Sequence, residues 1–100
     1  MTVSSLNSKA YVSLIIPAFN EEARIVKSLD RIFSFLKSEP YSTEVIIVDD
    51  GSKDRTGDLV RERYNNHDGV RIYQQSNNLG KGAAVKQGML LASGEYLFFS

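Results

Sequence analysis

The chain has 100 residues, with 12 basic and 12 acidic side chains, so its formal net charge at pH 7 is zero. A balanced charge gives no electrostatic reason to expect binding to nucleic acid or to an acidic membrane. The chain has no cysteine, which excludes disulfides and thiolate metal sites. Its 42% hydrophobic content is ordinary for a globular protein of at most one domain.

The first ten residues are polar and lack the apolar core of a signal peptide. We expect residues 1–10 to form a disordered tail and residues 11–100 to form the folded unit. No apolar run approaches the roughly 20 residues that span a bilayer. These residues therefore predict a soluble chain. The expected location is the cytoplasm, or the cytoplasmic face of a membrane for the parent protein.

The first predicted strand is the apolar run YVSLII at residues 11–16, which Pro17 is expected to end. A helix should follow, with Asn20 as its N-cap and with Glu21 and Glu22 in its first turn, where the helix dipole favours acids. Its predicted apolar stripe consists of Ile25, Leu29, Ile32 and Leu36.

The second predicted strand is EVIIV at residues 44–48, and a polar loop follows it. Asp54 is expected to cap the next helix, because aspartate accepts hydrogen bonds from free N–H groups at a helix start. The core face of that helix is predicted to carry Leu59, Val60 and Tyr64.

The last part of the chain repeats the alternation of strand and helix. Residues 69–74 predict a third strand, and residues 76–82 form a glycine-rich loop. Residues 83–93 predict a helix of mostly small side chains, which Gly94 should end. Residues 95–100, EYLFFS, begin a fourth strand.

This alternation predicts an α/β fold with a Rossmann-like parallel sheet and helices on both faces. In such sheets, ligands bind beyond the carboxyl ends of the strands. Three loops should therefore meet on one rim: residues 17–22, 49–54 and 74–82.

Several side chains on this rim allow two interpretations. Of the adjacent Asp49 and Asp50, we expect one to cap the following turn and the other to bind a ribose hydroxyl or a base N–H. Phe19 can stack on a nucleobase or pack on Val26 at the helix entry. Glu21 can reach a ribose or simply favour the helix dipole.

The segment NLGKGAA can cradle a phosphate with backbone N–H groups at a helix start, with Lys81 adding positive charge. It lacks the spacing of a Walker loop. Alternatively, Gly80 and Gly82 only let the helix approach the sheet closely.

Four segments together resemble the N-terminal half of glycosyltransferase family 2, which has the GT-A fold: VSLIIPAFNEE, VIIVDDGSKDRT, NNLGKGAAVKQGM and SGEYLFFS. The resemblance runs from about residue 11 to the end of the chain. Within the family, the NLGKGAAV loop is most like that of the polyprenyl-phosphate glycosyltransferases, especially the dolichyl-phosphate β-glucosyltransferases.

The resemblance implies roles for individual residues. Pro17 and Phe19 match positions that flank or stack the base, with Phe where Tyr is common. Glu21 matches a ribose contact, and Lys81 a basic position near the diphosphate. Three further matches lie at the end of the second strand: Val48 beside the base, Asp50 as the carboxylate that binds the base or ribose, and Asp49 as its support.

The resemblance also implies the reaction. The family transfers a sugar from a nucleotide diphosphate, here UDP-glucose by preference, to a polyprenyl phosphate or another acceptor. Its Asp-x-Asp motif, which holds Mg²⁺ or Mn²⁺, would begin after Ser100, and the acceptor site and catalytic base would lie further on. We therefore expect a donor-binding portion without catalytic residues, inactive when isolated and binding no metal alone.

Three alternatives compete with this interpretation. A dinucleotide-binding oxidoreductase domain needs G-x-G-x-x-G after the first strand, and residues 17–22 contain no glycine. A receiver-type signalling domain carries its acid pair after the first strand, not the second. The third alternative, a non-catalytic nucleotide-binding fragment, stays open.

The consecutive Leu97, Phe98 and Phe99 predict self-association through an apolar strand.

Overall fold

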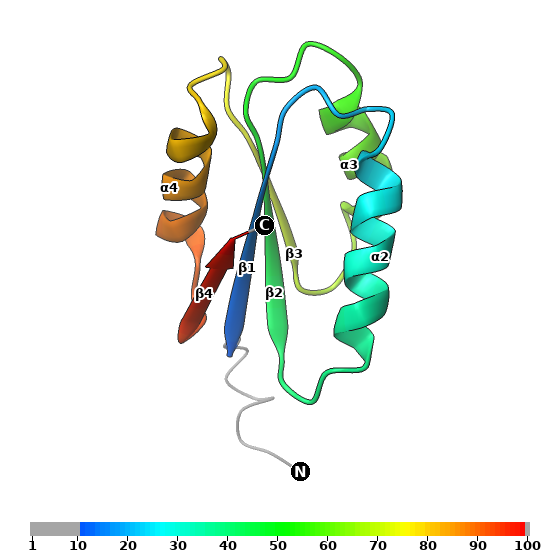
Figure 1. The fold of residues 1–100 in the computed structure, drawn as a ribbon, viewed down its shortest axis with the longest axis vertical. Coiled ribbons are helices and arrows are strands. Elements are labelled where there is room, and N and C mark those ends of the chain that lie inside the picture. Colours follow the sequence, from blue (N-terminus) through cyan, green and yellow to red (C-terminus); the bar gives the residue numbers. More distant parts are fainter. Residues whose placement is uncertain (1–10, 100) are drawn as a thin grey trace.

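The computed structural model describes residues 11–99, so the expected tail at residues 1–10 lies outside the described part of the chain. Strands and helices alternate through this part (Figure 1). The strands are β1 (Val12–Ala18), β2 (Thr43–Asp49), β3 (Val70–Gln74) and β4 (Tyr96–Phe99). The helices are α2 (Ile25–Lys37), α3 (Thr56–Tyr64) and α4 (Lys81–Leu91).

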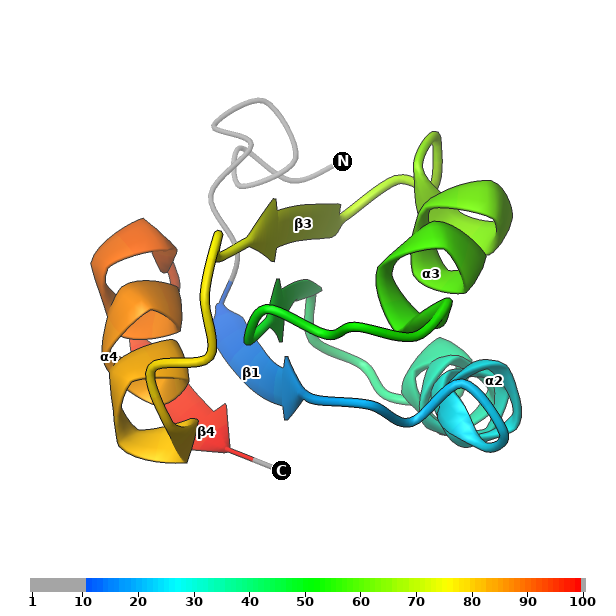
Figure 2. The same cartoon turned by 90° about the horizontal axis from the view of Figure 1, so that it is seen from above.

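The strands form one parallel sheet in the order β3-β2-β1-β4, which confirms the predicted α/β class. Ile15 in β1 pairs with Ile46 in β2 on one side and with Phe99 in β4 on the other. Seen from above, α4 covers one face of the sheet, and α2 and α3 cover the other (Figure 2). The two central strands are therefore covered on both faces, as their apolar sequences require.

Alternate residues of β1 and β2 fill two separate cores, because successive side chains of a strand point to opposite faces. The core under α2 and α3 contains Ile16, Ala18, Val45 and Ile47, together with Ile25 and Leu29 of α2 and Val60 and Tyr64 of α3. The core under α4 contains Ile15, Ile46, Val48 and Ala84. The predicted apolar stripe of α2 and the predicted core face of α3 are thereby confirmed.

The predicted start of the first helix is wrong. Asn20 has a φ of 49°, whereas an N-cap residue takes an extended backbone, and α2 begins only at Ile25 with no acid in its first turn. Asn20 instead joins the first loop to the second: its N–H donates to Ser52 Oγ (2.9 Å), and its Oδ1 accepts from the Lys53 N–H (2.9 Å). Contacts between loops outweigh the local capping signal.

Pro17 does not end the first strand, which continues to Ala18. Along β1, the backbone N–H and C=O groups of successive residues face the two neighbouring strands in turn. The Tyr11 carbonyl faces β4 and the Ala18 carbonyl faces the β2 side. Pro17 alternates in step with Tyr11, so its nitrogen also faces β4. The pairing with β4 stops at Ile15 and Phe99. Because no acceptor within residues 11–99 faces that nitrogen, the proline removes no ladder hydrogen bond from the described part of the sheet.

The glycines around α4 act differently from the sequence interpretation. Gly80 and Gly82 have no atom within 4 Å of the position a Cβ would take, so they do not serve a close approach to the sheet. Gly88 does, because its Cβ would come within 2.4 Å of Ile15 Cγ2. Gly94 is not the helix stop either: α4 ends at Leu91, and a Cβ on Gly94 would lie 2.7 Å from Ser13 Oγ.

A buried carboxylate joins three strands and the end of α4 at the amino ends of the strands. Glu44 Oε2 accepts hydrogen bonds from Ser13 Oγ (2.6 Å), the Ser93 N–H (2.6 Å) and Ser93 Oγ (2.9 Å). Its other oxygen lies 3.9 Å from the Arg71 guanidinium. Burial alone raises the pKa of Glu44, but the hydrogen bonds from both serines and the charge of Arg71 outweigh it and hold the pKa below its usual value.

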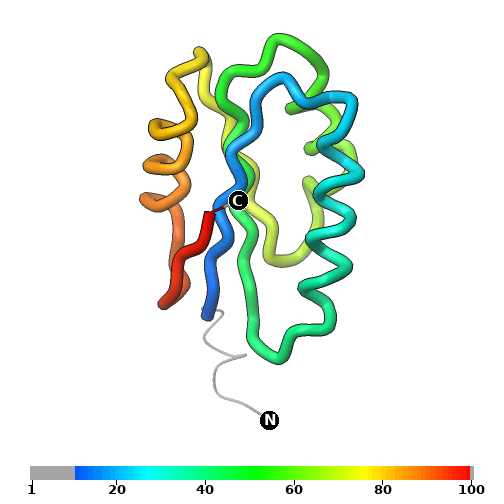
Figure 3. The backbone as a smooth tube through the Cα atoms, viewed as in Figure 1, coloured from blue at the N-terminus to red at the C-terminus, as the bar shows by residue number. Residues whose placement is uncertain are grey.

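The opposite end of the sheet gathers the three predicted rim loops. The backbone trace shows the connections after β1, β2 and β3 lying together beyond the carboxyl ends of the strands (Figure 3). Asp54 is not the N-cap of α3, because the helix begins at Thr56 with Arg55 as its N-cap and without a side-chain cap; Asp54, one residue earlier, accepts a hydrogen bond from the Thr56 N–H through its Oδ1 (2.9 Å). None of the helices at residues 11–99 is long and apolar enough to cross a membrane.

Candidate nucleotide site

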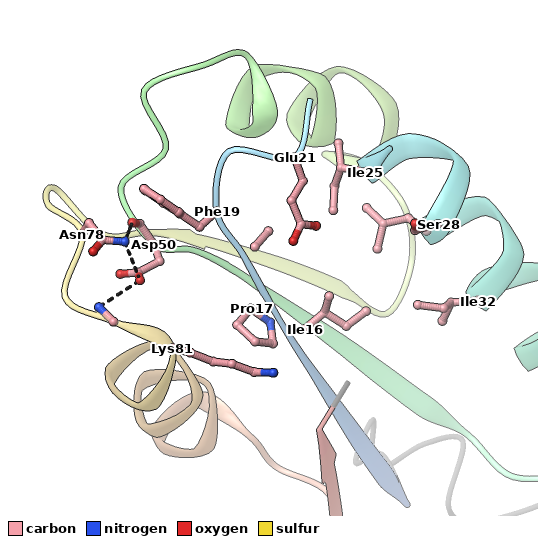
Figure 4. A pocket seen from close by; sticks show the side chains of 13 residues that line it. Ile16, Pro17, Phe19, Glu21, Ile25, Ser28, Ile32, Asp50, Asn78 and Lys81 are labelled. Carbon is pink, nitrogen blue, oxygen red and sulfur yellow. Dashed lines mark hydrogen bonds between the residues drawn. The ribbon is translucent and has the colours of Figure 1, made fainter. Parts of the chain in front are cut away.

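A cavity of about 460 Å³ lies at the carboxyl end of β1, between α2 and the start of α4 (Figure 4). Five of the predicted site residues line it: Pro17, Phe19, Glu21, Asp50 and Lys81. They come from all three rim loops, so the fold brings these separate parts of the chain together. Its apolar wall comes from β1 and α2 and includes Ile16, Ile25 and Leu29.

Two predicted site residues do not line the cavity. The Val48 side chain is fully buried in the core under α4. Asp49 is also buried, and its Oδ1 accepts a hydrogen bond from the Ser52 N–H (3.0 Å), so it caps the turn after β2. Its Oδ2 is a buried atom without a hydrogen-bond partner among the described residues. Both side chains lie behind the site rather than in it.

Glu21 and Lys81 enter the cavity from different elements. Glu21 is held through its backbone, whose N–H donates to Thr56 Oγ1 at the start of α3 (2.7 Å). Its carboxylate stands 3.8 Å from Arg24, a largely exposed partner that adds little constraint. In the close view, the side chains of Glu21 and Lys81 extend toward the same space beside Pro17 (Figure 4). The site therefore offers an acceptor and a cation to one ligand.

Phe19 is 40% exposed, which is high for a large aromatic side chain. It lines the cavity beside Pro17, whereas Val26 packs against the core under α2 and α3. An exposed ring at the rim leaves apolar surface free for a flat ligand. Such surface favours stacking with a nucleobase, since every base presents a π-face.

Asp50 organises the third loop. Its carboxylate accepts hydrogen bonds from the side chains of Gln75 and Asn78 and from the backbone N–H groups of Leu79 and Gly80. The sequence interpretation did not single out Gln75 or Asn78, although Asn78 also lines the cavity. The amide-rich stretch QQSNN before the glycines was the available signal, since such side chains satisfy a neighbouring carboxylate.

The described residues do not fit a bound divalent cation. Within residues 11–99, no three His, Cys, Asp or Glu side chains come close enough together to hold a metal ion. Lys81 places a positive charge where α4 begins, and the first turn of α4 carries no acid. That end of the cavity therefore suits an anion such as a phosphate.

The parallel sheet and the cavity at its carboxyl end define an α/β fold of the GT-A type, the fold of the solved glycosyltransferases described below. The sequence model of the family described as "Glycosyl transferase family 2" matches residues 13–100. This chain belongs to that family.

Curated relatives and solved structures agree with the family. A dolichyl-phosphate beta-glucosyltransferase of Trichomonas vaginalis is 39% identical over 92 residues, covering 87% of this chain and 28% of the relative. A mannosyltransferase from Pyrobaculum calidifontis in complex with GDP-Man and Mn²⁺ superposes with a TM-score of 0.76 at 28% identity, covering 89% of this chain and 26% of that one. TarS of S. aureus in complex with UDP-GlcNAc superposes with a TM-score of 0.64 at 32% identity, covering 88% and 25%. The chain thus spans about a quarter of the length of the relative and of the two solved chains.

Proposed function

We propose that residues 11–100 bind the nucleotide-diphosphate sugar that a family 2 glycosyltransferase uses as its donor. The observation that carries the proposal is the cavity at the carboxyl end of β1, which Phe19, Glu21 and Lys81 line together. An exposed ring, a carboxylate and a cation match the base, the ribose and the diphosphate in that order. The uncharged wall of β1 and α2 shields the ligand from water on one side.

The residue roles follow from chemistry and position. Phe19 stacks on the base with Pro17 at its edge, because both present apolar surface at the rim. Glu21 accepts hydrogen bonds from ribose hydroxyls, which are donors that a carboxylate binds well. Lys81 and the start of α4 attract the diphosphate. Val48 and Asp49 support the site from behind.

For the whole protein, we propose transfer of glucose from UDP-glucose to dolichyl or another polyprenyl phosphate. The similarity to dolichyl-phosphate beta-glucosyltransferases supports this acceptor and this sugar. A divalent cation, Mg²⁺ or Mn²⁺, would stabilise the charge of the leaving diphosphate, and the Mn²⁺ in the Pyrobaculum calidifontis structure supports it. Such a reaction suits the cytoplasm or the cytoplasmic face of a membrane. Residues 11–99 take no part in holding that ion in this proposal.

A nucleotide titration followed by backbone amide NMR tests the donor site. UDP should shift the resonances of residues 17–21 and 78–82 with an affinity in the millimolar range, roughly 4 kcal/mol of binding free energy. GDP serves as the comparison, because the Pyrobaculum calidifontis mannosyltransferase binds GDP-Man. Equal shifts with both nucleotides would agree with a diphosphate subsite but would contradict a preference for uridine. Shifts scattered over other surfaces would contradict the site.

We further propose that the chain self-associates through β4. Leu97, Phe98 and Phe99 are 38%, 55% and 53% exposed, and β4 pairs with β1 alone among the described strands. An apolar strand with unpaired backbone groups favours pairing with another chain. A net charge of zero provides no repulsion against it.

A further inference from the structure

Two loops at the rim of the cavity are joined by hydrogen bonds between residues 20–22 and residues 52–56. Each of these five bonds runs from a backbone N–H of one loop to a side-chain oxygen of the other, over 2.7–3.1 Å. Three of the donors belong to residues 20–22, so the backbone of the first loop depends on side chains of the second. The accepting side chains are those of Asn20, Glu22, Ser52, Asp54 and Thr56.

Thr56 differs from the other four acceptors because it is fully buried, whereas they are exposed or half-buried. The Thr56 Oγ1 accepts a hydrogen bond from the Glu21 N–H at 2.7 Å. Water can replace an exposed acceptor at little cost. A buried acceptor has no such substitute, so without the Thr56 hydroxyl the Glu21 N–H loses its partner.

The Thr56 hydroxyl has a fixed direction. Asp54 Oδ1 accepts hydrogen bonds from both the hydroxyl and the N–H of Thr56. Burial raises the pKa of Asp54, but the hydrogen bonds from Thr56 and from the Glu22 N–H outweigh it and hold the pKa below its usual value. Asp54 is therefore a carboxylate, which only accepts hydrogen bonds. The hydroxyl proton points to Asp54, and the oxygen of Thr56 accepts from Glu21.

Glu21 is thereby fixed on both sides of its Cα atom. Its N–H is held by Thr56, and its carbonyl accepts from the N–H groups of Arg24 (2.9 Å) and Ile25 (2.8 Å), where α2 begins. The Glu21 side chain lines the cavity and extends toward the space beside Pro17 (Figure 4), whereas Thr56 is not a lining residue. The position of the Glu21 carboxylate therefore depends on a hydroxyl outside the cavity.

We propose that Thr56 is a positioning residue of the donor site: its buried hydroxyl holds the Glu21 N–H so that the Glu21 carboxylate meets the ribose hydroxyls. Thr56 acts through Glu21 and does not contact the nucleotide. This inference rests on the proposed function. A carboxylate that is already in place lowers the ordering cost of binding. A nucleotide without ribose hydroxyls gains nothing from it, which separates this role from a general structural one.

The first experiment needs no ligand. Thr56→Val keeps the shape of the side chain but removes the hydroxyl, so the Glu21 N–H loses its acceptor. Hydrogen exchange of the Glu21 amide should become at least about tenfold faster, while exchange of the Ile46 and Ile47 amides in β2 stays unchanged. Thr56→Ser keeps the hydroxyl and should keep Glu21 exchange within about twofold of the unmodified chain. Unchanged Glu21 exchange in Thr56→Val would overturn the proposal.

Thr43→Val is the matched control. Thr43 Oγ1 is buried and has no hydrogen-bond partner among residues 11–99, and Thr43 begins β2, at the end of the sheet opposite the cavity. The same change there should leave Glu21 exchange and UDP affinity unaltered. If Thr56→Val does not fold, Thr56→Ala removes the same hydroxyl and is compared with Thr56→Ser in its place.

The second experiment compares UDP with dideoxy-UDP, in which both ribose hydroxyls are replaced by hydrogen, in titrations followed by NMR shifts. Thr56→Val should weaken UDP binding about fivefold but dideoxy-UDP binding by no more than about twofold, because only UDP offers ribose hydroxyls to Glu21. Thr56→Ser should keep the affinity for UDP. An equal loss for both nucleotides in Thr56→Val would overturn the proposal. If UDP shifts no resonance of the unmodified chain, the proposed function fails, and the exchange experiment alone decides whether Thr56 holds Glu21.

Discussion

Gly88 of α4 lies directly against Ile15 of β1, so that a Cβ added to the glycine would come within 2.4 Å of Ile15 Cγ2. Ile15 is fully buried in the middle of the sheet and pairs with Ile46 and Phe99. The absent side chain lets α4 approach the sheet closely. Because Lys81 is the first residue of α4, this contact also helps to determine where Lys81 lies at the cavity.

We expect Gly88→Ala to lower the free energy of unfolding by about 1–3 kcal/mol, since the added methyl group overpacks a contact that cannot relax easily. Gly82→Ala in the same helix is the matched control. No atom lies within 4 Å of its Cβ position, so better helix propensity should leave stability equal or raise it by up to about 1 kcal/mol. Urea unfolding followed by circular dichroism measures both. Equal stability of the two variants would contradict the close contact.

The Glu44 network predicts a pH dependence of stability. The folded state lowers the pKa of this carboxyl, so its contribution is fully present above the ordinary glutamate value, roughly 4.3, and is lost as the pH falls through the lower folded pKa. The stability difference between the unmodified chain and Glu44→Gln should therefore be largest near pH 7 and should shrink toward pH 3. Urea midpoints across this range measure it. Glu62→Gln, at an exposed ion pair with Arg55, should show little effect at any pH.

The proposed stacking role of Phe19 predicts which substitutions UDP binding tolerates. Phe19→Ala should weaken UDP affinity about tenfold, or about 1.4 kcal/mol, because base stacking on an aromatic ring is lost. Phe19→Tyr keeps the ring and should retain the affinity. Phe35→Ala removes a more exposed ring from α2, outside the cavity, and is the control. Loss of affinity in Phe35→Ala, or its retention in Phe19→Ala, would argue against stacking at the rim.

Two matched substitutions distinguish self-association through β4 from nonspecific aggregation. Phe98→Lys should convert micromolar samples to monomers in sedimentation velocity, because burying lysine in an apolar strand interface is unfavourable. Leu79→Lys introduces the same charge at an apolar side chain that is 63% exposed, in the loop before α4. It should leave the association unchanged. A monomeric unmodified chain would refute the interface directly.

Much of the fold could be predicted because local patterns carry it. The buried strands are continuous β-rich runs, and the stripe of Ile25, Leu29 and Ile32 repeats with the helical period. Alternation of strand and helix leads to a parallel sheet, and a parallel sheet brings the loops to one edge. For that reason, the sequence also indicated that Phe19, Asp50 and Lys81 would share a site.

The features that were missed depend on contacts between distant parts of the chain. Asn20 has the side chain of an N-cap, but its partners Ser52 and Lys53 lie on another loop. Gly88 looks like any helical glycine until Ile15 is placed beneath it.

The sequence by itself determined the alternating elements, the two-faced core and the chemical groups available at the rim, because each follows from residue type and spacing within one segment. Only the tertiary structure decided which hydrogen bonds hold these groups in place. Asp50 and Lys81 both line the cavity, and the folded chain brings four donors from residues 75–80 to the Asp50 carboxylate. The physical reason is that hydrogen-bond saturation depends on which donors lie within about 3 Å, and these donors lie 25 to 30 residues away along the chain.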